Sequence, residues 1–197
     1  MKNLITISAP SGAGKTTLCR AIQAEICQIK WSVSYTTRKK RKMEKNGIDY
    51  QFISEPTFKN HIDNSFFAEW EKVHGFYYGT SKDSVNNIIQ KNEMLLLEMD
   101  VKGALSIKKL YPNKTFSIFI TPPSLDHLRK RLQKRGTDSE YRINIRLQRF
   151  KEEMKYVSRF DFNLLNDDLA KAKDQLLDII LKIKKGDNNG IKNNTIS

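Results

Sequence analysis

Residues 9–17 of the chain are Ala9-Pro10-Ser11-Gly12-Ala13-Gly14-Lys15-Thr16-Thr17. They follow a short apolar run, Leu4–Ser8, which predicts a buried strand. The residues after them carry apolar side chains at the spacing of one helix face: Leu18, Ala21, Ile22 and Ile26. The glycines allow a tight turn in which successive backbone N–H groups point inward. Because a helix dipole begins just after this turn, the stretch is suited to binding phosphate groups.

The same stretch matches the Walker A motif, which requires a strand before it and a helix after it. Lys15 would supply a mobile charge for the β- and γ-phosphates of a nucleotide, and the Thr16 hydroxyl could ligate Mg²⁺. The first glycine of the motif is Ala9 here, which is tolerable only if that residue keeps a negative φ. The alternative is a glycine-rich turn without a ligand, and Lys15 and Thr16 at the start of the helix argue against it.

The composition indicates a globular protein with one core and inserted subdomains. The chain has 197 residues, of which 39% are hydrophobic. No apolar run is long enough to span a bilayer. The apolar stretch among the first residues is too short for a signal peptide. Cys19 and Cys27 fall on the predicted first helix, about 12 Å apart, too far for a disulfide. We therefore expect reduced thiols and a cytoplasmic location.

The chain is strongly basic, with 35 Lys and Arg against 22 Asp and Glu and a net charge of +13. Nucleic acid, a membrane surface and nucleotide phosphates would all suit this sign. Many lysines are scattered or lie in the polar tail, and no nucleic-acid-binding motif accompanies them. We therefore interpret the charge as a solvated surface and expect no nucleic-acid or membrane partner.

A basic segment follows the predicted first helix. Residues 31–35 alternate like a half-buried strand, and residues 36–47 are rich in Arg and Lys without an apolar period. This segment could be a disordered basic loop. Its position after a phosphate loop and a strand favours a second phosphate site instead, because arginines bind phosphate through a fork of donors.

An acidic residue among aromatic residues leaves two interpretations open. Glu69 stands in Phe66–Trp70, and Tyr77-Tyr78-Gly79 predicts a turn soon after it. A short strand at 50–53 and a helix beginning after Ser54 precede them. The residues around Glu69 could be core packing with one solvated acid. They could equally form a pocket in which a carboxylate recognises the edge of a base.

Further apolar runs predict the remaining strands of a parallel sheet. Met94–Leu97 is continuous enough for a buried strand, and it leads into Glu98 and Asp100. Acids at the carboxyl end of such a strand face the nucleotide crevice, where they can hold Mg²⁺-bound water or substrate. The alternative is a pair of solvated acids. Residues 116–120 and 160–165 are the other strand candidates.

The last third of the chain predicts three helices. The first begins after Ser124 and ends at Gly136, and the second begins at Ser139. The second helix carries an apolar stripe of Ile143, Leu147, Phe150, Met154 and Val157. Beside it runs an arginine row of Arg142, Arg146 and Arg149, which would suit a lid that closes on phosphates or a merely solvated basic face. The third helix is capped within Asn166–Asp168 and precedes a polar tail, residues 185–197, expected to be disordered.

Together these motifs resemble the guanylate kinase family over residues 2–184. The matching segments are residues 8–17, 33–38, 47–50, 77–79, 100, 122–124 and 166–168. The resemblance implies an α/β fold: a P-loop NTPase parallel-sheet core with helices on both faces, a small mixed-β monophosphate-binding insertion and a helical lid. It places the core at 1–32, 84–125 and 157–184, the insertion at 33–83 and the lid at 126–156.

The resemblance also assigns site residues. Catalytic roles fall on Lys15, Arg41, Arg135 and Arg146. ATP-binding roles fall on Ala9, Pro10, Ser11, Gly12, Ala13, Gly14, Lys15, Thr16, Thr17, Arg131 and Asn166. GMP-binding roles fall on Ser34, Arg38, Arg41, Glu44, Tyr50, Glu69, Tyr78, Thr80 and Asp100, with Ser34 and Glu69 reading guanine. Metal binding falls on Thr16 directly and on Asp100 and Glu98 through water. Arg142 and Arg149 have no counterpart in the family pattern.

The function implied is Mg²⁺-dependent transfer of the ATP γ-phosphoryl group to GMP or dGMP, giving ADP and GDP, by a monomer or small homo-oligomer. Three departures from the family pattern concern the monophosphate loop and the strand end: Lys40, Met43 and Glu98. Two alternatives share the resemblance. One is a scaffold-type guanylate-kinase-like domain that binds phosphopeptides without catalysis, and the other is a related kinase that acts on a phosphorylated sugar.

Overall fold

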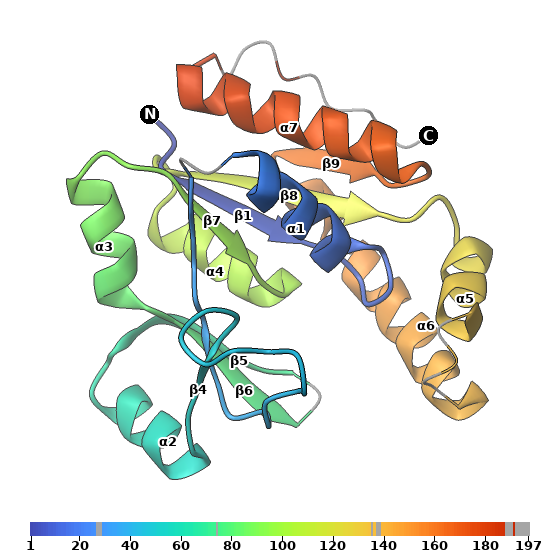
Figure 1. The fold of residues 1–197 in the computed structure, drawn as a ribbon, viewed down its shortest axis with the longest axis horizontal. Coiled ribbons are helices and arrows are strands. Elements are labelled where there is room, and N and C mark those ends of the chain that lie inside the picture. Colours follow the sequence, from blue (N-terminus) through green and yellow to red (C-terminus); the bar gives the residue numbers. More distant parts are fainter. Residues whose placement is uncertain (27–28, 74, 135, 137–138, 188–190, 192–197) are drawn as a thin grey trace.

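The computed structural model describes residues 1–26, 29–73, 75–134, 136, 139–187 and 191. A five-stranded sheet, in which every strand pair is parallel, has the order β2-β7-β1-β8-β9. Its strands are β1 (Leu4–Ser8), β2 (Lys30–Trp31), β7 (Leu95–Glu98), β8 (Thr115–Thr121) and β9 (Phe162–Leu165). Its flanking helices are α1 (Lys15–Glu25), α3 (Lys82–Gln90), α4 (Val101–Leu110) and α7 (Leu169–Lys185). Figure 1 shows this part of the chain above a second, smaller sheet.

Both faces of the large sheet are buried, each by its own apolar cluster. Ile5 and Ile7 of β1 join the cluster under α1 and α7, whereas Leu4 joins the cluster under α3 and α4. Successive side chains of a strand point to opposite faces, so a continuous apolar run supplies both clusters at once. The prediction of an α/β fold with helices on both faces of a parallel sheet is confirmed.

A second sheet lies below the first in Figure 1 and is mixed, with the order β4-β3-β6-β5. Its strands are β3 (Tyr35–Thr36), β4 (Gln51–Phe52), β5 (Phe67–Val73) and β6 (Phe76–Ser81). Helix α2 (Glu55–Asp63) packs on it and begins as the sequence predicts, since the Ser54 hydroxyl accepts a hydrogen bond from the Thr57 N–H at 3.1 Å. Phe58 of α2 is fully buried and stacks on Phe67, with ring centroids 4.4 Å apart.

Two helices form a separate hairpin at the right of Figure 1: α5 (Leu125–Lys134) and α6 (Glu140–Met154). They pack through a small apolar cluster of Leu128, Leu132, Ile143 and Leu147. Ser124 caps α5 through its hydroxyl oxygen, as predicted, and Ser139 caps α6 in the same way. A short 3₁₀ helix, η1 (Val157–Arg159), connects α6 to β9.

Residues 31–35, predicted as one strand, are divided between the two sheets. β2 ends at Trp31 and pairs with β7, whereas β3 begins at Tyr35 and pairs with β4 and β6. The Ser32 N–H still donates to the Leu96 carbonyl at 2.8 Å, and the chain then leaves the large sheet. The prediction of one strand was wrong because alternation of polar and apolar residues does not say which strand is the partner.

The predicted turn at Tyr77-Tyr78-Gly79 is also wrong, since all three residues belong to β6. Gly79 pairs with Tyr35 on one side and Trp70 on the other. A Cβ at this position would lie 2.8 Å from a Phe67 ring carbon and 3.0 Å from Phe58. The glycine is therefore required by two aromatic rings that pack against the strand backbone, and not by a turn.

The end of the chain departs in part from the predicted polar tail. Helix α7 extends to Lys185, and Gly186 ends it with a φ of 80°. Ile191 packs against the core cluster under α1 and α7. Residues 188–190 and 192–197 lie outside the described residues, and so does Cys27, which was expected on the first helix. In the part of the chain that the structure describes, no helix has the length and apolar character needed to cross a bilayer.

Candidate active site

The phosphate loop joins β1 to α1 as the sequence predicts. Gly12 and Gly14 adopt φ values of 96° and 93°, a conformation that side chains disfavour. A Cβ on Gly14 would collide with the side-chain amide of Asn166. The Ala13 N–H donates to the Pro10 carbonyl at 3.0 Å, which closes the turn. Ala9 is not among the described residues with positive φ, so alanine fits where the motif has its first glycine.

Two predicted residues at the start of α1 meet the carboxyl end of β7. The Lys15 Nζ donates to the Met99 carbonyl at 2.8 Å and lies 4.0 Å from Glu98 Oε1. The Thr16 hydroxyl donates to that same Glu98 oxygen at 2.8 Å. An amine, a hydroxyl and a carboxylate thus converge where the loop opens. The hydroxyl and carboxylate oxygens suit Mg²⁺, a hard cation that takes oxygen ligands.

Behind the loop, a pocket of about 300 Å³ lies between α1, α5 and α7. Its walls are Gly12, Gly14, Thr17, Arg131, Lys134, Asn166 and Leu169. Arg131 Nη2 donates to the Asn166 carbonyl at 2.9 Å, and the Asn166 side-chain amide donates to the Ala13 carbonyl at 2.6 Å. The two residues predicted to bind ATP outside the Walker motif therefore lie together against the loop.

The α5–α6 hairpin reaches the phosphate loop through Arg146, whose guanidinium donates to the Ser11 hydroxyl. The contact joins residues far apart in the sequence, on α6 and in the loop after β1. A cation from the hairpin therefore already lies at the mouth of the loop. Arg135, the other arginine predicted for catalysis in this hairpin, lies outside the described residues.

The basic segment after β3 is held by a carboxylate. Arg38 donates from both terminal nitrogens to the two Glu44 oxygens, at 3.0 and 2.7 Å, with both side chains largely buried. Glu44 also accepts from the Arg41 N–H at 2.8 Å. The hydrogen bond with Arg38 is the main reason that the pKa of Glu44 falls below its usual value. The Glu44 carboxylate therefore orients the arginines, although its own charge would repel a phosphate. The Arg41 side chain is 76% exposed.

Two tyrosines predicted for the same site lie beside Arg38. Its guanidinium carbon is 5.4 Å from the centre of the Tyr50 ring, and the Tyr50 and Tyr78 rings are 6.0 Å apart. Burial, followed by the negative charge of Glu98, raises the pKa of Tyr50 to about 12. Glu98 belongs to β7 and also contacts Thr16. Its effect on Tyr50 therefore connects the phosphate loop with the basic segment after β3.

Glu69 lies where the small sheet meets α4. Its Oε1 accepts a hydrogen bond from the Thr80 hydroxyl at 2.6 Å. Burial raises the pKa of the Glu69 carboxyl to about 7, the Thr80 hydrogen bond opposes this, and the negative charge of Asp100 adds to it. Asp100 caps α4, with Oδ1 accepting from the Gly103 N–H at 2.9 Å. Ser34, the other residue predicted to contact guanine, is half-buried directly before β3.

A β-bulge turns Glu69 toward this junction. Phe67 pairs with Ser81, yet Glu69 pairs with Thr80, so β5 carries one extra residue between them. Without the bulge, Phe67 and Glu69 would share a face of the sheet because they are two residues apart. With it, Phe67 joins the aromatic cluster around Phe58 while Glu69 faces α4. The structure therefore places Glu69 beside the core's strand-end acid rather than among the aromatic rings.

Gly103 is a site residue that the sequence analysis missed. A Cβ on it would lie 2.7 Å from Glu69 Oε2 and 3.0 Å from Asp100 Oδ1. Only a glycine therefore lets the first turn of α4 approach the two acids so closely. A helix former such as Ala would be the default in this turn, so an isolated glycine one turn after a capping aspartate was the available signal.

We expect Gly103→Ala to raise the KM for the acceptor nucleotide by about tenfold, because a displacement of Glu69 by a fraction of an ångström misaligns its hydrogen bonds. The KM for the donor should stay within about twofold, since Gly103 lies away from the phosphate loop. Steady-state kinetics with each substrate varied in turn would measure both. Lys109→Ala, on the exposed face of the same helix, is the control. Equal acceptor KM values for the two variants would contradict the role of Gly103.

Comparison with known proteins identifies the relatives of this chain. The family model for guanylate kinase matches residues 1–183. The chain belongs to the guanylate kinase family. It is 42% identical over 176 residues to a guanylate kinase of Wolinella succinogenes, covering 89% of this chain and 82% of that protein. A guanylate kinase of Thermotoga maritima is 40% identical over 177 residues, covering 90% and 85%.

A solved structure agrees with the sequence relatives. The crystal structure of guanylate kinase from Anaplasma phagocytophilum superposes with a TM-score of 0.73 at 28% identity, covering 91% of this chain and 85% of that one. The resemblance drawn from the motifs is therefore confirmed. Guanylate kinases are transferases that act as nucleoside monophosphate kinases, and membership places this protein in that class.

Proposed function

We propose that the protein transfers the γ-phosphoryl group of ATP to GMP, and also to dGMP, giving ADP and the guanosine diphosphate. One observation carries the proposal. The end of β7 and the start of α4 join the two halves of the site: Glu98 contacts Thr16 at the phosphate loop, and a Cβ on Gly103 would lie 2.7 Å from Glu69 of the insertion. A donor phosphate at the loop and an acceptor held by the insertion would therefore share one crevice.

The donor would lie along the phosphate loop and α1. Backbone N–H groups of residues 11–15 would bind its phosphates, with Lys15 at the β- and γ-positions. The pocket bounded by Arg131 and Asn166 is large enough for its base. The Thr16 hydroxyl would hold Mg²⁺ directly, and Glu98 and Asp100 would hold it through water. Bound there, Mg²⁺ supplies charge neutralisation between the donor's phosphates.

The acceptor would be held by the insertion. Arg38, oriented by Glu44 and flanked by Tyr50 and Tyr78, would bind the phosphate of GMP together with Arg41. The ionised Glu69 carboxylate would accept from the ring N–H and the exocyclic amine of guanine. Adenine does not present two donors side by side there, so this contact would select the base.

The chemistry requires alignment and charge neutralisation more than proton transfer. The acceptor phosphate is already an oxyanion, so no general base is needed. Lys15, Arg38, Arg41, Arg135 and Arg146 would offset the repulsion between two polyanions and hold them in line. Closure of the α5–α6 hairpin would exclude water and so suppress hydrolysis of the donor.

A coupled assay of ADP formation with MgATP tests the proposal. The acceptors are GMP, dGMP, AMP and ribose 5-phosphate at equal concentration. We expect turnover with the two guanine nucleotides and a rate at least about 10³-fold lower with the others, because a base-reading pair left unpaired costs several kcal/mol. Turnover of ribose 5-phosphate at the GMP rate would favour a sugar-phosphate kinase. No turnover of any acceptor would favour a phosphopeptide-binding domain.

The raised pKa of Glu69 predicts a pH dependence of acceptor use. The free carboxyl has a pKa of about 7, and guanine requires its ionised form. As the pH falls below about 7, kcat/KM for GMP should therefore fall by up to about tenfold per pH unit, since this ratio reports ionisation in the free enzyme. Rates between pH 5.5 and 8.5 would measure it. The phosphates also titrate, so the same profile for Glu69→Gln is the control, and identical profiles would contradict the prediction.

A further inference from the structure

The arginine row on α6 contains an ion pair that the family pattern does not explain. Arg149 Nε donates to Glu153 Oε1 at 2.6 Å, one turn further along the helix. Most pairs of this spacing lie in solvent and contribute little. Here the Glu153 side chain is 12% exposed and that of Arg149 is 30% exposed. The pair is therefore on the side of α6 that is covered by other parts of the protein.

Glu153 lies on the side of α6 that also carries Arg146, two turns earlier. Burial is the main cause that raises the pKa of its carboxyl, and the hydrogen bond from Arg149 opposes this. Asp100 and Lys15 also act on it electrostatically, although they belong to the α4 cap and the phosphate loop. Arg146, two turns earlier on α6, contacts Ser11 of that loop. The Arg149–Glu153 pair therefore lies on the side of α6 that reaches the phosphate loop.

One oxygen of Glu153 has no donor. Its Oε2 is buried, and no hydrogen-bond partner reaches it among the described residues. A buried acceptor without a partner lowers stability, and a merely structural pair would not be expected to retain that cost. The cost is understandable if the carboxylate is there to hold a cation beside the reacting groups in a fixed direction.

We propose that Arg149 is a further phosphate-binding residue of this enzyme and that Glu153 is the positioning residue that orients it. The proposal rests on the function proposed above and adds a cation to it. With Nε bound to Glu153, the guanidinium is held in a fixed direction on the side of α6 that also carries Arg146. Its terminal nitrogens would donate to the transferring phosphoryl group as negative charge moves between donor and acceptor. The contact forms and breaks no covalent bond.

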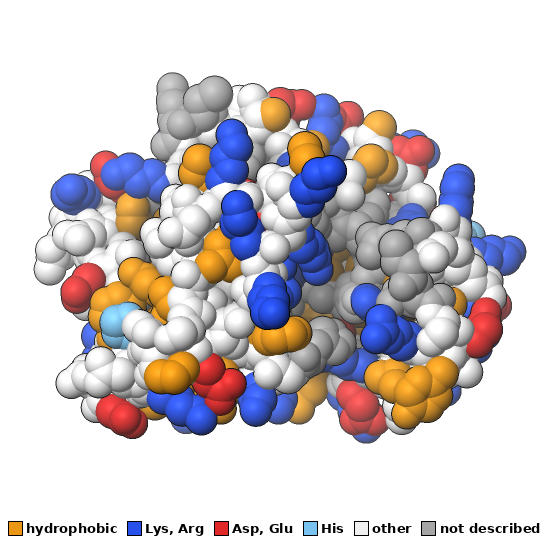
Figure 2. Space-filling model, turned by 60° about the horizontal axis from the view of Figure 1, so that its bottom comes forward, with side chains coloured by type: hydrophobic (Ala, Val, Ile, Leu, Met, Phe, Trp, Pro, Cys, Tyr) orange, Lys and Arg blue, Asp and Glu red, His pale blue; other side chains and the backbone are white. Residues whose placement is uncertain are grey.

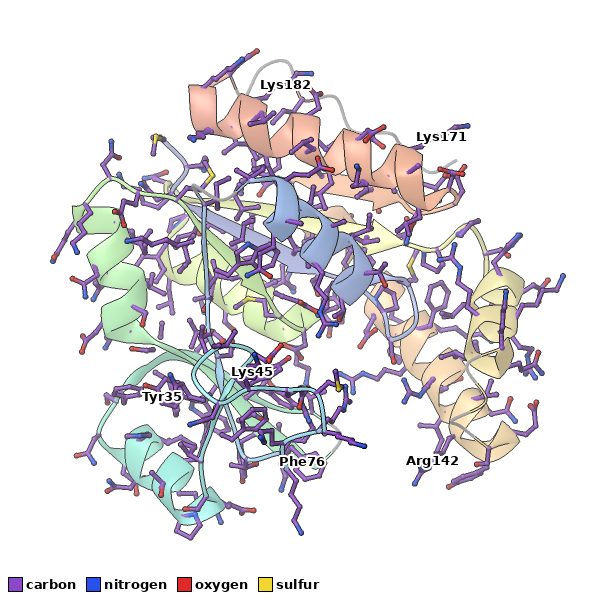
Figure 3. The ribbon with its side chains drawn as sticks, in the orientation of Figure 1. Tyr35, Lys45, Phe76, Arg142, Lys171 and Lys182 are labelled. Carbon is purple, nitrogen blue, oxygen red and sulfur yellow. The ribbon has the colours of Figure 1, made fainter. Side chains whose placement is uncertain are left out.

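Arg142 supplies a matched control on the same helix. It belongs to the same row, but it is exposed and extends from the end of α6 far from the large sheet (Figure 3). Its removal changes net charge and helix composition as much as the removal of Arg149. A difference between Arg149→Ala and Arg142→Ala therefore reports position and not charge alone.

We expect Arg149→Ala to lower kcat about 10- to 100-fold, less than the loss of a sole transition-state arginine because other cations remain. Arg142→Ala should keep kcat within about twofold. The KM for GMP should change little in both, because the contact is made mainly in the transition state. Thermal unfolding of each variant would verify that the fold is intact. If Arg149→Ala and Arg142→Ala have the same kcat, the role of Arg149 is overturned.

Glu153→Gln tests the orientation. It removes the anchoring charge while conserving shape, so we expect a loss of kcat of about the same size as in Arg149→Ala. The double variant should be no slower than Arg149→Ala, because two residues that act as one unit are not additive. Additive losses, or a wild-type kcat in Glu153→Gln, would overturn the positioning role. Wild-type protein that does not turn over GMP would instead overturn the proposed function, which separates the two failures.

Discussion

Lys15→Ala is expected to lose turnover by a factor of about 10³ or more while the protein stays folded. Lys15 is the cation of the phosphate loop, and its Nζ lies 2.8 Å from the Met99 carbonyl and 4.0 Å from Glu98. Alanine removes the charge that would stabilise the β- and γ-phosphates during transfer. Among the described residues it removes one side-chain hydrogen bond, which costs about 1 kcal/mol, and the 4.0 Å ion pair with Glu98.

Initial rates at saturating ATP and GMP, together with thermal unfolding, would measure both parts of this expectation. Lys171→Ala is a suitable control, because Lys171 is exposed on α7 and away from the loop (Figure 3). Lys171→Ala removes the same charge as Lys15→Ala. The surface carries many other lysines and arginines, several of which lie along the middle of the face shown in Figure 2. A Lys15→Ala variant with turnover within about tenfold of wild type would refute the role of Lys15.

Glu69→Gln is expected to raise the KM for GMP by about 10²- to 10³-fold and to leave the KM for ATP within about threefold. The glutamine oxygen can still accept from the Thr80 hydroxyl, as Glu69 Oε1 does at 2.6 Å. The amide –NH₂, however, would then face the guanine N–H groups, so that donors meet donors. The loss falls on base recognition because the phosphate-binding arginines are unchanged.

The measurement is steady-state kinetics with GMP varied at fixed ATP, followed by the reverse. Glu55→Gln, on the exposed start of α2, makes the same chemical change outside the site. Equal KM values for GMP in the two variants would show that Glu69 does not read the base. A rise in the KM for ATP as large as that for GMP would point to a general distortion of the crevice.

Local signals in the sequence were sufficient for the phosphate loop and for most elements of the large sheet. The loop depends on two glycines with positive φ and on a lysine and a threonine at the start of a helix, all within a few residues. The continuous apolar runs at β1, β7 and β8 predicted strands buried on both faces. Helices α2, α5, α6 and α7 begin at the capping residues that the sequence shows.

Two of the errors have the same physical origin. The alternation at residues 31–35 is real, yet its two ends pair in different sheets. Gly79 resembles a turn signal, yet it is required by Phe58 and Phe67, which come from other elements. Helices α3 and α4 were not predicted as such, although both follow capping residues, Ser81 and Asp100. In the first two cases the deciding contact is with residues distant in the sequence, whereas the caps of α3 and α4 are local hydrogen bonds.

The sequence by itself determined the family and the phosphate loop, because these depend on short motifs and their order. Only the tertiary structure shows that Glu69 is buried beside α4 and is not a solvated acid. The bulge in β5 turns this carboxylate away from the aromatic rings, and the absence of a side chain at Gly103 lets α4 approach it. Likewise, only the packing of α6 against the loop distinguishes Arg146 and Arg149 from Arg142. Strand register and helix packing are set by long-range contacts, which no local pattern encodes.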